Sequence, residues 1–529
     1  MKKSLLYLLS LIALSACNGK KIGGDAPECD SDSIRAELAK NIPDTIGLPV
    51  KQFPSVGEIT YKVTVFDSTC SGRLDDYRDP YLNTPGKFAF RANSMRDADF
   101  GGTVKGTPKE VVKVWQFNTE VDNTKTSVGS FGGGTGWTGQ PLYVEWPDSL
   151  VQRFKKESPA LTADFSNREI IINSLCGRSY FLNFDTGKPT RQPLDVGNPV
   201  KGTATLHPAL NGMMYVGQGL PCRPPMGQCA INLFKHERVF FQGNDSRAWR
   251  SWGANDSSPL VRGGFLFWPS ENGTIYKYKI QSDGNITLHT TLQYRANNDG
   301  AAGVENSICI YKNLGFFGDN HGDVLCIDLD TMEPVWHYDN HDDIDGTIVC
   351  EVENDVPYLY CGCEVDRQGN TGMCHFVKLN GIDGSLVWEN QIPCKKLNLG
   401  GKHFDGGLYC SPLIGHGDCE GMIFASICQR NNTSHAEFTA FDRKTGKILY
   451  QTPLNYFAWN SPVAFYNEKN KLFIFCGDSS GWGYLIDGKT GKIIFKQHLA
   501  NNFESSPVVV GNQFVVGSRG VEIYKFEVR

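Results

Sequence analysis

The sequence predicts an all-β fold, an eight-bladed β-propeller whose blades are four-stranded antiparallel sheets. Three observations predict it. The 529-residue chain contains 57 glycines, 31 phenylalanines and 20 tyrosines, a composition that favours strands and tight turns. A hairpin phrase recurs along the second half of the chain. The last repeat unit contains only three strands, one fewer than a four-stranded blade. Repeats also explain the length, because each unit buries its apolar face against its neighbours instead of enlarging a single core.

The first residues predict a lipid-anchored export signal. Lys2 and Lys3 precede an apolar stretch from Leu5 to Leu14. That stretch is shorter than the roughly 20 residues that a membrane-spanning helix needs. The following residues, 14–17, resemble a bacterial lipobox, in which the Cys17 thiol receives the lipid. We expect a signal peptide over residues 1–16 and a lipidated tether with a small lead-in region over 17–87. An ordinary secretory signal that happens to carry a cysteine is the alternative.

The remaining sixteen cysteines are an even number, as disulfide pairing in an oxidising compartment requires. Several lie close together in the sequence, including Cys222 with Cys229 and Cys363 with Cys374. We therefore expect disulfides that staple long loops, although buried free thiols are the alternative. The chain contains no CxxC pair or CxxCH haem motif. Its formal net charge of −5, without a basic tract, argues against nucleic acid as a partner.

The recurring phrase has the chemistry of a β-hairpin. An apolar strand ends at Asp or Asn, a turn follows with Gly at its tip, and a second strand closes on an aromatic residue. Asp or Asn caps such a turn, and Gly adopts the positive φ that other residues resist. The closing aromatic is expected to pack between neighbouring sheets. Copies occupy residues 379–388, 441–450 and 486–495, with variants at 326–336 and 184–188.

A second phrase precedes each hairpin and sets the number of blades. It begins with a small residue, often followed by Pro, and continues as two short apolar strands. Clear copies begin at Ser258, Ser461 and Ser506. Looser copies begin near Pro141, Pro208, Ser307, Thr347 and Ser411. Eight starts at these intervals are typical of four-stranded propeller blades with loop insertions.

The two ends of the repeat region complement each other. The last copy ends at residues 521–528 after only three strands. An unassigned strand at residues 111–117 lies upstream of the first copy and carries Trp115, an aromatic of the outer-strand type. We expect this strand to complete the last blade, which joins the chain ends and removes exposed sheet edges.

These hairpins, together with the opening phrase at residues 88–96 and the Trp115 that follows, resemble the quinoprotein (PQQ-like) propeller repeat. The resemblance covers residues 88–529 and implies one eight-bladed propeller over that range. It implies little about activity, because one propeller design serves enzymes, scaffolds and binding proteins.

The candidate site is the funnel formed by the loops that lead into the innermost strands. In nearly every copy a carboxylate or amide stands just before the inner strand, and aromatic residues accompany it. The candidate ligand-binding residues are Trp252, Asp256, Glu305, Asn306, Asp345, Asp405, Trp459, Asn460 and Glu504.

Two interpretations of these residues remain. Hard oxygen donors are suited to Ca²⁺, with Glu305, Asn306 and Asp345 as the candidate ligands, and aromatics stack on flat or sugar-like ligands. Alternatively, Asp and Asn before a strand simply bond their own backbone. Carbohydrate binding through Trp249, Trp252 and Trp459 is a further hypothesis.

The resemblance also raises PQQ-dependent dehydrogenation, in which PQQ lies between a tryptophan and a ring formed by two adjacent cysteines. Here Cys361 and Cys363 are separated by Gly362, so that ring is absent. We therefore expect a non-catalytic, membrane-anchored module that binds a protein or small ligand. A periplasmic PQQ- and Ca²⁺-dependent dehydrogenase of alcohols or sugars is the alternative. Asn18 after Cys17, rather than Asp, favours the outer membrane by resemblance to lipoprotein sorting rules.

Overall fold

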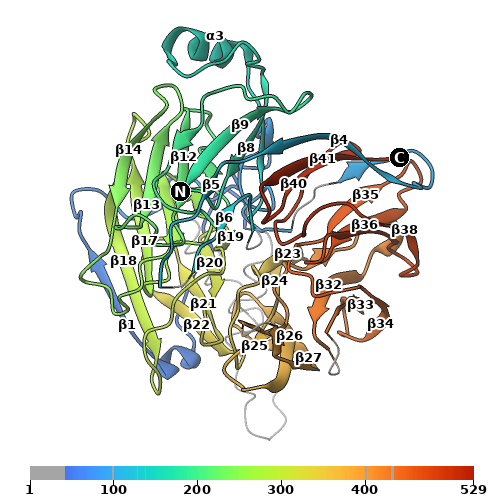
Figure 1. Cartoon of the computed structure of the whole chain (residues 1–529). Helices are drawn as coiled ribbons and strands as arrows, with labels where there is room; N and C mark the ends of the chain where they lie inside the picture. The colour runs from blue at the N-terminus through green and yellow to red at the C-terminus, as the bar shows by residue number, and fades with distance from the viewer. Residues whose placement is uncertain (1–41, 98–100, 128, 137–138, 400–401, 431–433) are drawn as a thin grey trace, which may run out of the picture.

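The computed structural model describes residues 42–97, 101–127, 129–136, 139–399, 402–430 and 434–529. The predicted signal peptide and Cys17 lie outside these residues. Eight antiparallel sheets of four or more strands surround a central axis and form an eight-bladed β-propeller (Figure 1). Fold class and blade number are therefore as predicted. Within the described residues, no helix is both long and apolar enough to cross a membrane.

The blades follow one another along the chain, and each runs outward from its inner strand. The first two blades contain β7 (Leu142–Glu145), β8 (Arg168–Asn173), β9 (Arg178–Asn183) and β10 (Leu194–Asp195), then β11 (Thr205–Leu206), β12 (Met213–Gly217), β13 (Gln228–Asn232) and β14 (Glu237–Gln242). The third and fourth contain β15 (Leu260–Arg262), β16 (Phe265–Pro269), β17 (Thr274–Ile280) and β18 (Ile286–Ala296), then β19 (Cys309–Tyr311), β20 (Leu314–Gly318), β21 (Asp323–Asp328) and β22 (Pro334–Asp339).

The remaining blades repeat the arrangement. The fifth and sixth contain β23 (Val349–Glu353), β24 (Val356–Gly362), β26 (Thr371–Asn380) and β27 (Leu386–Lys395), then β31 (Leu413–Ile414), β32 (Met422–Cys428), β33 (Ala436–Asp442) and β34 (Ile448–Pro453). The seventh contains β35 (Val463–Tyr466), β36 (Leu472–Gly477), β37 (Trp482–Asp487) and β38 (Ile493–His498). The eighth combines β39 (Val508–Val510), β40 (Gln513–Gly517) and β41 (Glu522–Val528) with β4 (Val111–Asn118).

The eighth blade therefore draws its strands from both ends of the described chain. Strand β4 pairs antiparallel with β41, from Val111 opposite Val528 to Asn118 opposite Glu522. The two strands lie side by side in Figure 1, although more than 400 residues separate them in the sequence. Trp115 of β4 then contacts the first blade, where its Nε1 donates to the Phe184 carbonyl.

Further helices and strands, most of them short, lie outside the four strands named for each blade. They are η1 (Pro54–Glu58), β1 (Ile59–Val65), β2 (Gly86–Lys87), β3 (Gly102–Thr103), β5 (Val121–Asp122), β6 (Gly132–Gly133), α3 (Asp148–Glu157), β25 (Glu364–Val365), β28 (Leu397–Leu399), β29 (Lys402–Phe404), β30 (Gly406–Gly407) and η2 (Gly417–Cys419). Strand β1 pairs antiparallel with β18 and adds a fifth, outer strand to the third blade. The part of the lead-in region that the structure describes is therefore packed on the propeller.

Several outer-strand aromatics lie on the glycine turn of the next blade. Three tryptophans make this contact: Trp115 on Gly187, Trp336 on Gly384 and Trp388 on Gly446. In each case a Cβ added to the glycine would lie only 2.7 Å from the indole ring. Each indole Nε1 also donates to a carbonyl beside that turn, over 2.9 to 3.1 Å. Ring packing and hydrogen bond together fix one blade against the next.

The opening phrase at residues 88–96 contacts the starts of inner strands. Buried Arg96 donates to the carbonyls of Phe90, Ser258 and Ile308. Buried Arg91 donates to the Pro412 carbonyl at 2.8 Å. The carbonyls of Ser258, Ile308 and Pro412 stand just before inner strands of three blades, so the two guanidiniums join those blades.

The predicted disulfides are not found. All fifteen cysteines in the described part of the chain are free thiols. Many occupy strand positions that point into the hydrophobic clusters between blades, as Cys326 and Cys361 do. There each thiol packs as a small apolar side chain. Closeness in sequence across a hairpin therefore did not translate into bonded pairs.

The glycine contact can be tested by paired substitutions. Gly446 has a φ of +72° and faces the Trp388 ring, whereas Gly421 has a φ of +80° and open space around its Cα. Both Gly→Ala variants carry the backbone cost of a positive φ, about 1 to 2 kcal/mol. Gly446→Ala should lose at least about 1 kcal/mol more, because the ring must move. Urea-unfolding midpoints measure the difference, and equal losses would refute the role of the indole.

Candidate functional site

A cavity of about 540 Å³ lies where loops from most blades converge. It is lined by Gly129, Ser130, Phe131, Lys201, Leu220, Trp252, Glu271, Glu305, Lys402, His403, Phe404, Trp459 and Arg519. These residues come from the second, third and eighth blades, from the segments between blades and from the loop between β5 and β6. Trp252, Glu305 and Trp459 of the predicted funnel residues are among them.

Trp252 and Trp459 both line this cavity. The Trp252 Nε1 donates to the Glu271 carboxylate at 2.8 Å, which fixes the indole beside an acidic group. The Trp459 ring stacks on Tyr409, with centroids 5.0 Å apart and planes inclined by 25°. Trp249 instead lies half-exposed beside Arg295, outside the cavity lining. The aromatic part of the site therefore includes Trp252 and Trp459, with Phe404 beside the latter, and Phe131 elsewhere in the lining.

Several carboxyl groups lie in the cavity lining or next to it. One carboxylate oxygen each from Asp256, Glu271 and Glu305 lie within 4.8 Å of one another. Lys201 supplies a positive charge, in an ion pair with Asp256 and 3.6 Å from Glu305. Asp256 and Glu271 are buried, whereas the Glu305 side chain keeps a quarter of its surface exposed. Glu305 is therefore the member of this group that faces the cavity.

A second group of acidic residues interacts electrostatically with Glu305 of the first group. Asp343 and Asp345 lie on the loop from β22 to β23, and Glu364 begins β25. Buried oxygens Oδ1 of Asp343, Oδ1 of Asp345 and Oε1 of Glu271 have no hydrogen-bond partner among the residues that the structure describes. A buried carboxylate oxygen without a donor or cation is costly. The geometry is therefore incomplete without protons or a cation.

The pKa values of these groups respond to this crowding. Burial, followed by the charges of Glu305 and Asp256, raises the pKa of Glu271 well above its usual value. Burial and Glu305 likewise raise the pKa of Asp345, while Lys201 opposes that rise. Burial and Asp345 raise the pKa of both Asp343 and Glu364. Like-charged carboxyls in a dry site favour the neutral form unless a cation compensates them.

Asn306 and Asn460 have structural partners instead. The Asn306 amide donates to the Gly346 carbonyl of the next blade and accepts from the Gly318 amide at 3.2 Å. Asn460 accepts from the Gly477 amide at the same 3.2 Å, in the equivalent position three blades later, while its buried Nδ2 has no hydrogen-bond partner among the described residues. Both side chains therefore bond the second strand of their own blade.

Asp405 and Glu504 lie at the periphery of the cluster. Asp405 is 3.1 Å from Lys396, which also pairs with Asp366 at 2.6 Å. Glu504 is buried and lies 3.4 Å from Arg519, a residue of the cavity lining. Their charges are therefore balanced by local cations, unlike those of Asp343 and Asp345.

The sequence analysis missed Lys201, Glu271, Asp343 and Glu364. Glu271 lies in the turn between the second and third strands of its blade, where other blades carry Asp319 and Asp478. Asp319 accepts a hydrogen bond from Tyr294 of the third blade, and Asp478 accepts one from Tyr484 of its own blade, both at 2.7 Å. Aligning this turn among the copies would have identified a second ring of carboxyls.

Comparison with known proteins supports the anchor and the fold. Residues 1–18 match the model described as "Prokaryotic membrane lipoprotein lipid attachment site". No curated protein matches the sequence. A europium-containing methanol dehydrogenase superposes with a TM-score of 0.57 at 12% identity, covering 84% of this chain and 99% of that one. The quinohemoprotein alcohol dehydrogenase of Comamonas testosteroni gives 0.56 and 12%, over 84% and 81%. BamB from Moraxella catarrhalis gives 0.49 and 13%, over 79% and 100%.

These similarities establish a lipid-anchored protein of the cell envelope with a PQQ-like propeller fold, as the repeats and the lipobox indicated. At such low identity the matched structures show the fold alone. They do not distinguish a binding module from a dehydrogenase, so that choice depends on the residues of the site.

The ring of turn carboxyls predicts a pH dependence of stability. Burial and the neighbouring Asp323 raise the pKa of Asp319 to about 8. Unfolding returns this pKa to about 3.9, so Asp319 releases its proton on unfolding between these values. Its contribution to stability is complete at low pH and is lost as pH rises to about 8. Asp319→Asn should flatten the decline in unfolding midpoint between about pH 5 and about pH 8, whereas Asp283→Asn, at an exposed turn, should not. An unchanged slope in Asp319→Asn would contradict this assignment.

Proposed function

We propose that this protein is a non-catalytic binding module of the bacterial envelope, anchored by a lipid on Cys17, whose funnel binds a hard divalent cation and a small ligand above it. The observation that carries the proposal is the set of buried, unpartnered carboxylate oxygens on Glu271, Asp343 and Asp345. Carboxylate oxygens are the donors that Ca²⁺ prefers. An ion among them neutralises charges that Lys201 alone balances only in part.

Glu305 is the central ligand in this proposal. Its carboxylate is near those of Asp256 and Glu271, and its charge raises the pKa of Asp345 and Asp343 as well. It thus connects the two acidic groups and faces the cavity. Asp345 joins it as a ligand, whereas Asn306 contributes by holding the strands.

The cavity above the cluster supports binding of a planar or sugar-like ligand. Trp252, Phe404 and Trp459 offer aromatic faces, while Lys201, Lys402 and Arg519 offer positive charge. Aromatic faces with a few convergent polar groups are typical of small-molecule sites. A protein partner at the rim is compatible with the same anchored propeller. Asn18 after Cys17 favours the outer membrane as its location.

The basic residues of the cavity favour one second candidate, a PQQ-dependent dehydrogenase. PQQ is a planar tricarboxylate, so Lys201, Lys402 and Arg519 are suited to its carboxylates and Trp252 or Trp459 to its rings. Bound PQQ would supply two-electron oxidation of an alcohol. The cysteines do not fit the cofactor equally well, because Cys361 and Cys363 are buried in a hydrophobic cluster between blades and do not line the cavity.

Calcium binding tests the main proposal. Saturating Ca²⁺ should raise the thermal midpoint of the full-length protein in detergent, since ligand at 100 times its Kd adds about 2.7 kcal/mol. Glu305→Gln removes one charge and should weaken Ca²⁺ binding about tenfold or more, measured by calorimetry. Glu157→Gln, on the exposed end of α3, is the matched control. Absence of any calcium effect on the unaltered protein would overturn the cation site.

A dye-linked assay separates the two candidate functions. The full-length protein incubated with PQQ and Ca²⁺ should give no turnover of primary alcohols or aldoses above a protein-free control. Turnover that disappears in Trp252→Ala and persists in Trp249→Ala would replace the binding module by the dehydrogenase. The second tryptophan is the appropriate control because it lies outside the cavity lining.

A further inference from the structure

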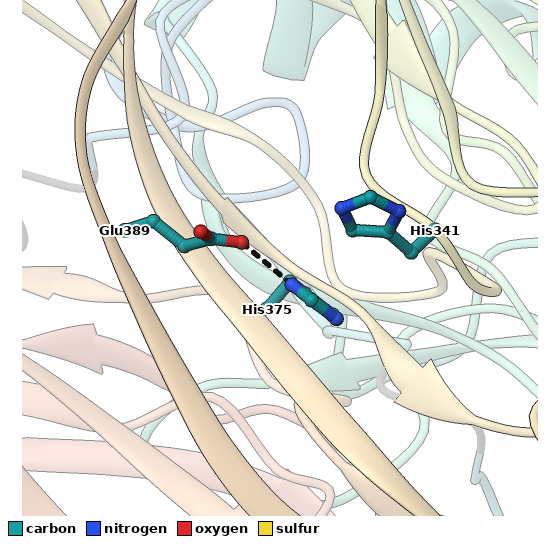
Figure 2. Close-up of side chains that lie close together, drawn as sticks. All are labelled: His341, His375 and Glu389. Atoms are coloured by element: carbon teal, nitrogen blue, oxygen red, sulfur yellow. Dashed lines mark hydrogen bonds and ion pairs between the residues drawn. The ribbon is translucent and has the colours of Figure 1, made fainter.

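A second group of metal-ligating side chains lies away from the funnel, between the fourth and fifth blades. It consists of His341, on the loop after β22, His375 on β26 and Glu389 on β27. Figure 2 shows the three side chains directed toward one another from these neighbouring elements. One ring nitrogen of each histidine and one carboxylate oxygen lie within 4.8 Å of one another.

We propose that His341, His375 and Glu389 bind a divalent transition-metal ion of the zinc type. Two imidazoles and one carboxylate are a ligand set that Zn²⁺ accepts, and three protein ligands leave a coordination position open. In a tetrahedral zinc site, ligand atoms at about 2.1 Å from the metal are about 3.4 Å apart. The most distant of these atoms therefore need to approach by up to about 1.4 Å, and the His375–Glu389 pair needs to separate slightly.

The histidine on β26 is already oriented for this role. His375 is largely buried, and its Nδ1 lies 2.6 Å from a Glu389 oxygen. A metal ion replaces the proton shared by this nitrogen and this oxygen, so that both atoms become ligands. Gln391 donates to the second oxygen of Glu389 at 3.1 Å, which fixes the carboxylate. The His375 amide also donates to the Cys363 sulfur at 3.2 Å and holds the strand in place.

The loop that carries His341 is tied to the same strand. Asn340 is completely buried, and its side-chain amide donates to the His375 carbonyl at 3.1 Å. His341 itself has a φ of +74°, an unfavourable conformation for a residue with a Cβ, and its amide donates to Asp339 at 2.8 Å. These contacts bring the two imidazoles to a centroid separation of 4.2 Å. Half of the His341 side chain is exposed, so its ring is free to adjust toward an ion.

The site opens onto solvent through a second cavity. His341 and Asp339 line a cavity of about 590 Å³, which is separate from the funnel cavity. His321, His337 and Asp323 line it as well. An ion at His341 is therefore accessible from outside, and its open position faces a cavity rich in further nitrogen and oxygen donors. Such an arrangement suits an exchangeable or ligand-accepting ion rather than a closed structural one.

Zinc titration tests the proposal. The full-length protein, without a polyhistidine tag and stripped of metal by chelation, should bind one Zn²⁺ at this site by calorimetry. Co²⁺ should give the visible absorption of nitrogen-ligated cobalt. His341→Ala should weaken Zn²⁺ binding by about 100-fold. Loss of a residue that only hydrogen-bonds to a metal ligand already lowers metal affinity about 10- to 100-fold. Since His341 is half-exposed, this variant should fold.

The controls separate this site from other histidines and from the funnel. His416 is equally exposed and lies 3.5 Å from Glu420, so His416→Ala removes a comparable histidine–carboxylate pair elsewhere. Zinc affinity should be unchanged in His416→Ala and in the funnel variant Glu305→Gln. Glu389→Gln should weaken zinc and leave calcium binding intact. Equal zinc affinity and cobalt absorption in His341→Ala and the unaltered protein would overturn the proposal.

Discussion

The structure depends on the contact between an outer-strand aromatic and the glycine turn of the following blade. Trp388 illustrates its two components: the indole covers Gly446, and its Nε1 bonds the Arg443 carbonyl. The glycine is required twice, since a φ of +72° suits a residue without Cβ and the ring occupies the space that a Cβ would take. A four-stranded blade cannot bury both faces alone, so repeated contacts of this kind convert separate sheets into one ring.

That ring determines what the funnel contains. Inner strands meet at the axis, and the segments that enter them bring their polar residues together there. Arg91 and Arg96 bind backbone carbonyls at the starts of inner strands, so their charges stabilise the scaffold rather than the acidic side chains. Oδ1 of Asp343 and Oδ1 of Asp345 are buried and have no hydrogen-bond partner in the described part of the chain. Proteins commonly concentrate such unfavourable electrostatics at functional sites, where a ligand compensates them.

The two proposed ion sites differ in chemistry because different parts of the blades build them. The funnel is assembled from loops that precede inner strands, which supply carboxylates suited to a hard cation. The His341 site is assembled from the loop that leaves the fourth blade and from two strands of the fifth blade. There two imidazoles and a carboxylate lie close together. Each site has its own cavity, so the two can be occupied independently.

The sequence by itself determined the all-β class, the eight blades and the lipid attachment site, because these follow from local rules. Asp and Gly at fixed places in a hairpin encode its turn, and the signal segment is read as a linear string. It also predicted a funnel formed by the residues before each inner strand, and ligand binding there stays a prediction. Tertiary structure decided which of them matter. It assigned Asn306 and Asn460 to the scaffold, added Lys201 and Glu271 from other turns, and left the described cysteines unpaired. These outcomes depend on burial and on distances between residues of different blades. The contact between His341 and His375 depends on such a distance as well. No local sequence pattern specifies these distances.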